Sequence, residues 1–91
     1  MRAARVDANQ AEITEALRGV GATVTPTHTV GKGFVDLVVG FRGENYLLEL
    51  KTPHGGLSPW EQIWHDSWRG RAHIVRSVED ALTAIGAVEY R

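Results

Sequence analysis

The sequence predicts an α/β fold, a small mixed sheet with flanking helices, in which residues 1–91 form one domain with the element order α-β-β-β-α-β-α. Three observations support this prediction. Hydrophobic residues recur at helical spacing near the N-terminus, two strand-like runs flank a tight turn in the middle of the chain, and two helix-capping patterns lie on either side of a short apolar run near its end. A chain of 91 residues is long enough to fold around one core.

The first predicted helix covers residues 7–18 and follows a loose basic arm over residues 1–6. Asp7 is a suitable N-cap, and Gln10 lies at the third helical position of a capping-box pattern. Gln10 also lies on the inward-facing stripe of the helix, at helical spacing from the hydrophobic residues. The stripe consists of Val6, Ile13, Leu17 and Val20, and Glu12 and Glu15 point away from it.

The first predicted strand covers residues 22–28, which are rich in β-branched side chains. Pro26 lacks a backbone N–H, and this marks the strand as an edge strand or as the position of a bulge. The following segment, Gly31-Lys32-Gly33, does not have the Walker pattern of a phosphate loop, and no helix follows it. We expect a mobile loop in which Lys32 contacts phosphate, although an ordinary solvated turn is equally consistent with these residues.

A β-hairpin is predicted in the middle of the chain. Residues 34–41 are apolar and β-branched apart from one acid, and residues 45–51 alternate between apolar and polar side chains. Arg42 and Gly43 lie between the two runs and suit a two-residue loop in which glycine adopts a positive φ.

The predicted turn brings two acidic residues together. A turn centred between residues 42 and 43 places Asp36 directly opposite Glu49. Because successive side chains of a strand point to opposite faces, Glu49 and Lys51 share this face with Asp36. Two facing carboxylates repel each other, and Asp36 interrupts an apolar run, which a solvated strand face does not explain. Acids in apolar surroundings therefore indicate a functional site.

The residue types at this position favour hydrolytic chemistry. A hard divalent cation between Asp36 and Glu49, with Mg²⁺ the usual case, removes the repulsion and leaves room for water and phosphate oxygens. Lys51 is placed to reach the same water or phosphate as a point charge. A metal ion, a water molecule and a lysine beside a phosphodiester form a hydrolytic centre. The alternative is a salt bridge of Lys51 with either acid on a solvated face, which does not explain the acid inside the apolar run.

A second helix begins with the strongest capping pattern in the chain. Ser58 is the N-cap, Pro59 lies in the first turn, and Glu61 completes a capping box. The helix is expected to end at about residue 68 or 69, with its tryptophan-rich face in the core or in an interface rather than stacked on bases. That face carries Trp60, Ile63, Trp64 and Trp68, and the other face carries Gln62, His65 and Arg69.

The last part of the chain predicts a strand followed by a helix. Residues 72–76 form the short strand, and Ser77 caps a helix over residues 78–85 that Gly86 ends. Asp80 lies at the capping-box position of this helix.

The composition excludes several classes of protein. No apolar run is long enough to span a membrane, and the N-terminus lacks the hydrophobic region of a signal peptide. The absence of cysteine excludes disulfides and cysteine-based zinc sites and is consistent with a reducing cytoplasm, and the four histidines show no zinc-ligand spacing. A net charge of −1 argues against a protein that coats DNA. A nuclease needs positive charge only near the phosphates, and Arg69, Arg71 and Arg76 cluster late in the chain.

Asp36 followed by Glu49-Leu50-Lys51 resembles the D…(D/E)-x-K signature of the PD-(D/E)XK nuclease superfamily. The wider pattern, which includes GKGFVDLVVG, YLLELKTPHGGLSPWEQ and HIVRSVEDAL, resembles the small stand-alone VRR-NUC proteins and, more distantly, the archaeal-type Holliday junction resolvases. The match covers nearly the whole chain. Val35 stands where the family usually has proline, a residue that shapes the beginning of the strand and takes no part in the chemistry.

The resemblance implies a restriction-endonuclease-like fold and a metal-dependent DNA endonuclease, structure-specific for branched DNA such as Holliday junctions. It implies that Asp36, Glu49 and the backbone carbonyl of Leu50 bind Mg²⁺, for which Mn²⁺ can substitute. Lys51 would then orient or activate the attacking water and offset charge on the phosphate. The small stand-alone members also imply a bacterial or phage-encoded protein of the cytoplasm.

Two glutamines are further catalytic candidates. Related nucleases often place Glu or Gln from the first helix beside the metal. The helix phase favours Gln10 for this position, whereas the offset along the sequence favours Glu12. Completion of the helix cap is an equally good interpretation of Gln10. The family pattern also has a Gln that lines the site, and Gln62 lies near a helix N-terminus, although a purely solvated Gln62 is the alternative. Lys32 and Arg69 are the candidate nucleic-acid contacts.

Two other functions stay open at this point, namely a DNA-binding or assembly module that keeps the fold without catalysis, and a nuclease that acts on RNA. The intact set of two acids and a lysine favours catalysis over the first of these. A two-fold homodimer is also predicted, as in the stand-alone resolvases that the chain resembles. Trp60, Trp64 and Trp68 on one short helix exceed what a domain of this size readily buries.

Overall fold

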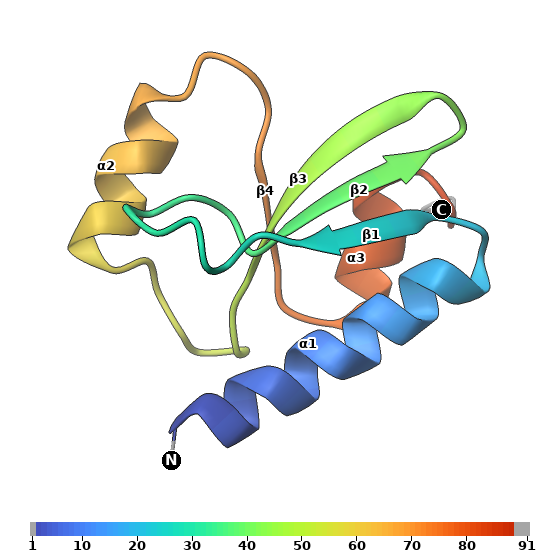
Figure 1. Cartoon of the computed structure of the whole chain (residues 1–91), viewed down its shortest axis with the longest axis horizontal. Helices are drawn as coiled ribbons and strands as arrows, with labels where there is room; N and C mark the ends of the chain where they lie inside the picture. The colour runs from blue at the N-terminus through green and yellow to red at the C-terminus, as the bar shows by residue number, and fades with distance from the viewer. Residues whose placement is uncertain (1, 89–91) are drawn as a thin grey trace.

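The computed structural model describes residues 2–88, with side chains described from residue 9 onward. Its elements follow the predicted order α-β-β-β-α-β-α (Figure 1). Within residues 2–88, no helix combines the length and the hydrophobicity that crossing a membrane requires. The helices are α1 (Arg2–Gly19), α2 (Pro59–Ser67) and α3 (Val78–Ala84), and the strands are β1 (Thr23–Pro26), β2 (Leu37–Phe41), β3 (Glu44–Leu50) and β4 (His73–Val75).

Helix α1 begins at Arg2 and therefore includes the residues that were predicted to form a loose arm. The stretch before Asp7 consists of arginine, alanine and valine without glycine or proline, so nothing in it interrupts a helix. Asp7 is consequently inside the helix rather than at its N-cap, and Gln10 is not part of a capping box. The predicted boundary was wrong because a suitable capping residue was given more weight than the helix propensity of the residues before it.

The buried stripe of α1 is confirmed at its centre. Ile13 and Leu17 are completely buried. Val20 is 41% exposed, contrary to the prediction, because it lies beyond the end of the helix in a turn where Gly21 adopts a φ of 97°. The side chain of Val6 lies outside the described residues.

The central hairpin has the predicted register, with Leu37 of β2 opposite Leu48 of β3. Both turn residues have a positive φ, 50° at Arg42 and 83° at Gly43. This is the two-residue turn whose twist matches that of the flanking strands. The positive φ predicted for Gly43 is therefore confirmed, and Arg42 shares it.

The sheet is mixed and has the strand order β1-β2-β3-β4. Antiparallel pairing joins β1 to β2 and β2 to β3, whereas β4 runs parallel to β3. Strand β1 is an edge strand, as Pro26 predicted, and Pro26 is its last residue. The regular strand is shorter than the predicted 22–28, but Thr27 continues the contact by donating its N–H to the Asp36 carbonyl.

Helices α1 and α3 contact each other and cover one face of the sheet, α1 along β1 and α3 along β4 (Figure 1). Successive side chains of each strand point to opposite faces of the sheet, so alternate residues face the core and the residues between them form a second face. The core side chains come from both helices and all four strands: Ile13, Leu17, Ala22, Val24, Leu37, Val39, Phe41, Leu48, Leu50, Val75, Ala81 and Ile85.

The second face of the sheet is only partly covered. By alternation it carries Val38, Leu47 and Ile74, of which the first two are half-buried and Ile74 is 41% exposed. Helix α2 does not lie along this face but beyond the end of the sheet where β2 begins and β3 ends (Figure 1). Glu49 and the residues that follow it therefore lie at the junction of the sheet and α2.

The predicted start of α2 is confirmed in every detail. The Ser58 hydroxyl accepts a hydrogen bond from the Glu61 N–H, the Glu61 carboxylate accepts one from the Ser58 N–H, and Pro59 lies in the first turn. The helix ends at Ser67, with Trp68 as its C-cap. Ser77 likewise caps α3 by accepting from the Asp80 N–H.

Most of the tryptophan-rich face of α2 is exposed instead of packed against the rest of the chain. Trp60 is 63% exposed, Ile63 is 60% exposed, and Trp68 is 42% exposed, so a place in the core of this chain is wrong for these three side chains. Trp64 is half-buried and packs edge-to-face on Phe34, at 5.4 Å between ring centroids. For these three side chains only the interface alternative stays open, because α2 contacts the rest of the protein through a polar cluster and through Trp64 on Phe34.

Candidate active site

Asp36 immediately precedes β2, and both of its backbone groups are hydrogen-bonded. Its N–H donates to the Leu48 carbonyl at 3.1 Å, and its carbonyl accepts from the Thr27 N–H at 2.7 Å. The side-chain Oδ2 accepts a hydrogen bond from the Leu50 N–H at 2.8 Å. The hairpin register continues to this position and brings the Asp36 carboxylate next to that of Glu49, as the turn predicted.

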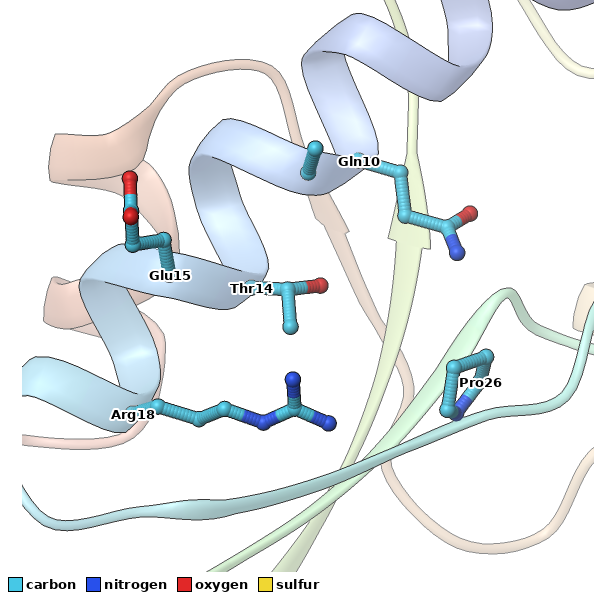
Figure 2. A pocket seen from close by; sticks show the side chains of 6 residues that line it. Gln10, Thr14, Glu15, Arg18 and Pro26 are labelled. Atoms are coloured by element: carbon cyan, nitrogen blue, oxygen red, sulfur yellow. The ribbon is translucent and has the colours of Figure 1, made fainter.

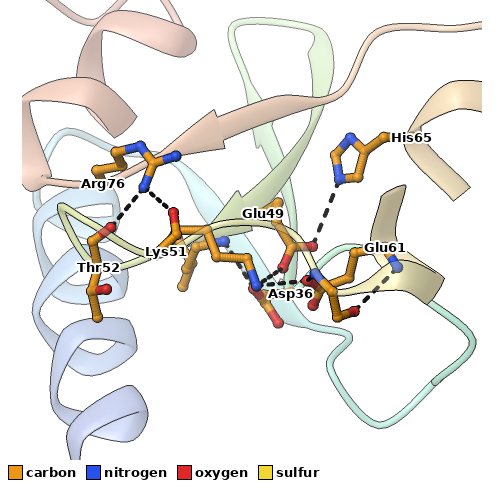
Figure 3. A network of polar contacts seen from close by, with 10 residues as sticks. Asp36, Glu49, Lys51, Thr52, Glu61, His65 and Arg76 are labelled. Atoms are coloured by element: carbon orange, nitrogen blue, oxygen red, sulfur yellow. Dashed lines mark hydrogen bonds and ion pairs between the residues drawn. The ribbon is translucent and has the colours of Figure 1, made fainter. Parts of the chain in front are cut away.

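Glu49 is 1% exposed and is the one buried charged side chain in the described part of the chain. Its two oxygens face different neighbours (Figure 3). Oε2 lies 3.5 Å from Nζ of Lys51, and Oε1 lies 3.9 Å from Nε2 of His65. Oε1 has no hydrogen-bond partner among the side chains of residues 9–88 or the described backbone. A buried carboxylate oxygen in that situation is unfavourable unless a cation or a proton compensates it.

The surroundings of Glu49 disfavour its charged form. Burial, followed by the negative charges of Asp36 and Glu61, raises the pKa of Glu49 to about 9, and the nearby Lys51 only partly offsets this. Without a cation, the carboxyl group therefore stays protonated at neutral pH. A positive ion beside it stabilises the ionised form directly.

Lys51 is linked to helix α2 through Glu61. Its Nζ lies 2.6 Å from Oε1 of Glu61, the same oxygen that accepts from the Ser58 N–H at 2.8 Å. Burial opposes the charge of Lys51, but the hydrogen bond and the charge of Glu61, with that of Glu49, outweigh burial and raise the pKa of Lys51. Burial likewise opposes the charge of Glu61, but the bond to Lys51 leaves the Glu61 pKa lowered. The pair is therefore an ion pair at neutral pH.

His65 lies one helical turn after Glu61 and on the same side of α2. Its side chain is 12% exposed, and its Nε2 is buried without a hydrogen-bond partner among the described residues. Burial lowers the pKa of His65, so the imidazole is neutral at neutral pH. The ring packs edge-on against Trp64 at 4.9 Å between centroids.

The donor chemistry of this cluster fits a divalent cation. Asp36 and Glu49 provide carboxylate oxygens, one of which is buried without a partner. Among the side chains of residues 9–88, no group of three or more histidine, aspartate or glutamate residues is already placed to hold a metal ion. Mg²⁺ is usually bound through only one or two carboxylates and keeps several waters, so the paired acids are sufficient for it.

Gln10 lies on the side of α1 that faces the sheet, as its helix phase predicted, whereas Glu12 is exposed. Figure 2 shows Gln10 lining a cavity between α1 and β1 together with Arg18 and Pro26. Pro26 pairs with Leu37, the residue after Asp36, so Gln10 lies toward the acidic end of the sheet. The structure does not bring it into the hydrogen-bonded cluster around Glu49.

Gln62 lies apart from this cluster. It is exposed, and its side-chain amide donates to Oδ1 of Asp66 at 2.9 Å. The α2 side chains beside Glu49 are instead Glu61 and His65. Sequence reasoning assigned Glu61 only to the helix cap and His65 to the outer face. The signal that identifies them is their spacing of four residues. Two polar side chains one helical turn apart lie on the same side of a helix, and near an acidic site this is the side that faces the site.

The loop that contains Lys32 lies against the beginning of α2. Gly33 adopts a φ of 83°, and a Cβ atom there would lie 2.7 Å from the carbonyl carbon of Trp60. Lys32 is exposed with a φ of 57°, and Arg69 is exposed just after α2. Both candidate nucleic-acid contacts are thus available to solvent, Lys32 in the loop at the beginning of α2 and Arg69 after its end.

Arg76, which was counted among the late arginines that supply positive charge, has a structural position. Its side chain donates to the backbone carbonyls of Thr52 and Gly55, and it is half-buried (Figure 3). These bonds fasten the loop that follows Lys51. Arg76 therefore positions the end of β3 rather than presenting charge to a partner, whereas Arg71 is exposed.

The sequence and the fold were both compared with those of known proteins. No family model matches the sequence, and no curated protein matches it. A solved structure described as a VRR_NUC domain matches with a TM-score of 0.71 at 21% sequence identity, over 87% of this chain and 91% of that chain. The chain therefore has the fold of a VRR_NUC domain, which is the fold that the sequence resemblance implied.

Proposed function

We propose that the protein is a metal-dependent nuclease that hydrolyses phosphodiester bonds in DNA, with branched DNA such as Holliday junctions as its substrate. The observation that supports this most strongly is the buried Glu49, with Asp36 and Lys51 held beside it, in a VRR_NUC fold. A buried acid that is fixed next to a second acid has little value for stability. It has a clear value for binding a cation at a reaction centre.

Each of the central residues has a distinct role in this proposal. Asp36 and Glu49 would hold Mg²⁺, or Mn²⁺ in its place, with the Leu50 carbonyl as a further ligand. When bound, the ion supplies Lewis-acid stabilisation of the phosphate and lowers the pKa of water. The hydrogen bond from the Leu50 N–H orients the Asp36 carboxylate before any ion arrives, because it fixes one of its oxygens.

Lys51 acts as a fixed positive charge in this proposal. Its raised pKa keeps it protonated at neutral pH, so it offsets negative charge that develops on the phosphate and orients the attacking water rather than removing a proton. Glu61 holds the ammonium group at 2.6 Å and is itself fixed by the helix cap. We therefore assign to Glu61 the α2 contribution that the resemblance assigned to Gln62.

Residues outside the cluster of Asp36, Glu49 and Lys51 would bind the substrate. Gln10 faces the acidic end of the sheet from α1 and is the proposed first-helix contribution to the site. The exposed Lys32 and Arg69 are the proposed phosphate contacts, one near the beginning of α2 and one after its end. A small number of local cations is enough for an enzyme that acts on a few phosphates, which agrees with a net charge of −1.

A two-fold homodimer completes the proposal, because paired incision of a junction requires two centres. The exposed apolar side chains of α2, Trp60, Ile63 and Trp68, which we call the α2 patch, supply a surface for self-association. Ile74 on the partly covered sheet face adds to the hydrophobic surface that one chain leaves exposed. A self-complementary patch around a two-fold axis is the commonest way to cover such a surface.

The test is cleavage of three labelled DNA substrates by the purified protein: a four-way junction, a flap and a plain duplex. With Mg²⁺ or Mn²⁺ we expect paired cuts in the junction and much slower cleavage of the duplex, and with EDTA no cleavage. Binding of the junction without cleavage in either metal would support an inactive DNA-binding module instead. Cleavage of an RNA junction in preference to DNA would overturn the assignment of the substrate.

A further inference from the structure

The pair of atoms Glu49 Oε1 and His65 Nε2 is not explained by the roles assigned so far. Both atoms are buried, and neither has a hydrogen-bond partner in the part of the chain whose side chains are described, residues 9–88. They face each other at 3.9 Å, which is too long for a direct hydrogen bond. Two buried polar atoms that point at each other without bonding indicate that a third group belongs between them.

The imidazole is held in this position by packing. His65 lies in the last turn of α2, and its ring packs against Trp64. Trp64 in turn packs edge-to-face on Phe34 and stacks on Trp68. The helix is fastened to the end of β3 by the ion pair between Glu61 and Lys51, and its capping box fixes the Glu61 carboxylate. The position of Nε2 relative to Glu49 is therefore set in advance by neighbouring side chains, as in a prepared ligand site.

We propose that Glu49 Oε1 and His65 Nε2 are joint ligands of a divalent transition-metal ion, such as Mn²⁺, in the active site. This inference rests on the proposed function, because it takes Glu49 to be a cation ligand. Two metal–ligand bonds of about 2.1 Å place neighbouring ligand atoms about 3.0 Å apart at an octahedral ion and about 3.4 Å apart at a tetrahedral one. The two side chains, at 3.9 Å, would therefore close by roughly 0.5 to 0.9 Å on the ion. The other oxygen of Glu49, which lies near Lys51, stays available to the chemistry described above.

The nature of the second ligand determines which ion is preferred. Imidazole nitrogen binds transition-metal ions well, whereas Mg²⁺ prefers oxygen ligands and water. A site made only of Asp36, Glu49 and a carbonyl would not distinguish the two ions strongly. A site that includes His65 should bind Mn²⁺ more tightly than Mg²⁺, and this preference should depend on His65.

The experiment measures the ligands of the ion directly. Untagged protein is stripped with a chelator and loaded with MnCl₂, and pulsed EPR is used to detect coupling of the Mn²⁺ electrons to ¹⁴N. The variants are His65→Gln and the matched control His28→Gln, since His28 is an exposed histidine of the loop after β1. Calorimetry gives the affinities for Mn²⁺ and Mg²⁺, and circular dichroism verifies that the variants fold.

We expect a ¹⁴N coupling in the wild type and in His28→Gln that is lost in His65→Gln. The Mn²⁺ affinity of His65→Gln should fall at least about tenfold, and its Mg²⁺ affinity by less than about threefold. Wild-type protein that binds Mn²⁺ without a ¹⁴N coupling would overturn the inference and would point to a water molecule between Glu49 and His65. This outcome does not depend on whether His65→Gln folds. Cleavage by such a protein would leave the proposed function intact, whereas nitrogen-bound Mn²⁺ in a protein that cuts no substrate would overturn only the nuclease activity.

Discussion

Glu49 affects both the stability of the fold and the proposed binding of a metal ion. The carboxylate lies in the second face of the sheet at 1% exposure, with Asp36 and Glu61 as acidic neighbours and Lys51 as the neighbouring cation. Lys51 is already paired with Glu61 at 2.6 Å, so it does not compensate a charge on Glu49 as well, and Glu49 stays protonated in the metal-free protein. A divalent ion beside Glu49 and Asp36 would stabilise the ionised form of Glu49.

The first prediction concerns the pH dependence of stability in the metal-free protein. The pKa of Glu49 rises on folding, from an ordinary 4.5 to about 9, so its contribution is fully present below about 4.5 and is lost as pH rises toward 9. In EDTA, the Glu49 contribution to the free energy of unfolding should therefore fall between about pH 5 and pH 9, by at most about 1.4 kcal/mol per pH unit, whereas the lowered pKa of His65 acts in the opposite direction below about pH 6.5. Urea unfolding at several pH values measures this.

The comparison variant for that measurement is Glu49→Gln, which cannot ionise and should lose this part of the pH dependence. Glu44→Gln is the matched control, since Glu44 is an exposed glutamate at the other end of β3. Its pH profile should follow that of the wild type. Parallel profiles for the wild type and Glu49→Gln would show that Glu49 is not held in a raised-pKa state.

The second prediction separates catalysis from metal binding at Lys51. Lys51→Ala should lower the cleavage rate by roughly two to three orders of magnitude, because a fixed charge at the phosphate is lost. Mg²⁺ affinity measured by calorimetry should stay within about threefold of the wild type or improve, since a neighbouring positive charge is removed. In Lys32→Ala, the control, DNA binding should weaken while the rate at saturating DNA stays close to that of the wild type.

A loss of Mg²⁺ binding in Lys51→Ala as large as in an Asp36 variant would contradict this assignment. Lys51 would then hold the acidic pair together rather than act on the phosphate. Its side chain would be a structural partner of Glu61 and Glu49, which is the salt-bridge alternative that the sequence left open.

At the scale of secondary-structure elements, α2 brings Glu61 and His65 to the sheet, and the loop before β2 sets its position. Gly33 allows the loop to approach the Trp60 carbonyl closely, and Phe34 packs on Trp64. The helix is therefore placed by one backbone contact, one aromatic contact and one ion pair. Changes in this loop should act on the site without touching a catalytic residue.

The third prediction tests this placement with two glycines of one loop. Gly33→Ala and Gly31→Ala both force alanine into a positive φ, 83° and 82°, which costs about 1 kcal/mol in each case. Only at Gly33 would the new Cβ meet α2, whereas nothing lies within 4 Å of the Cβ built at Gly31. Gly33→Ala should therefore lower both the melting temperature and the cleavage rate, and Gly31→Ala only the melting temperature. Equal cleavage rates for the two variants would contradict the proposed placement of α2.

The hairpin could be predicted from sequence because its information is local. Two turn residues fix the register, and the register determines which side chains face each other, so Asp36, Glu49 and Lys51 were grouped correctly. The capping box of α2 was equally local and equally correct. Both are short-range patterns in which a few neighbouring residues specify one geometry.

The orientation of α2 could not be predicted in the same way. Hydrophobic periodicity identifies the face a helix buries only when the helix packs on an apolar surface. Here Glu61 and His65 face a buried acid, and the exposed residues are Trp60 and Ile63, so periodicity gave the wrong inner face. The N-terminal boundary of α1 failed for a different reason, because helix propensity before Asp7 continued the helix past a suitable cap.

At the scale of the whole molecule, the distribution of hydrophobic surface is uneven. Helices α1 and α3 cover one face of the sheet, and the other face keeps Ile74 at 41% exposure. The α2 patch adds Trp60 and Ile63 at 63% and 60% exposure. Side chains of this size are rarely left in water together unless another surface covers them.

The fourth prediction is that a second copy of the chain covers the α2 patch. Analytical ultracentrifugation at micromolar concentration should give twice the 10.0 kDa mass of one chain. Ile63→Lys should shift the protein to the monomer and reduce paired cuts in a junction to single nicks. Val30→Lys is the control at an equally exposed position outside α2, 62% exposed, and should stay dimeric. A wild type that sediments as a single chain would exclude the dimer.

The most direct test of the central claim is the rate of four-way junction cleavage in Mg²⁺ by the wild type, Asp36→Asn and Asp66→Asn under single-turnover conditions. The asparagine at position 36 can still accept the hydrogen bond from the Leu50 N–H, so the local fold is preserved while a charged ligand is lost. Asp66→Asn changes an exposed acid of α2 and controls for overall charge. We expect cleavage by the wild type and Asp66→Asn, and a loss of at least about a thousandfold in Asp36→Asn. Wild-type cleavage rates in Asp36→Asn would contradict a metal-dependent phosphodiesterase centre at Asp36 and Glu49.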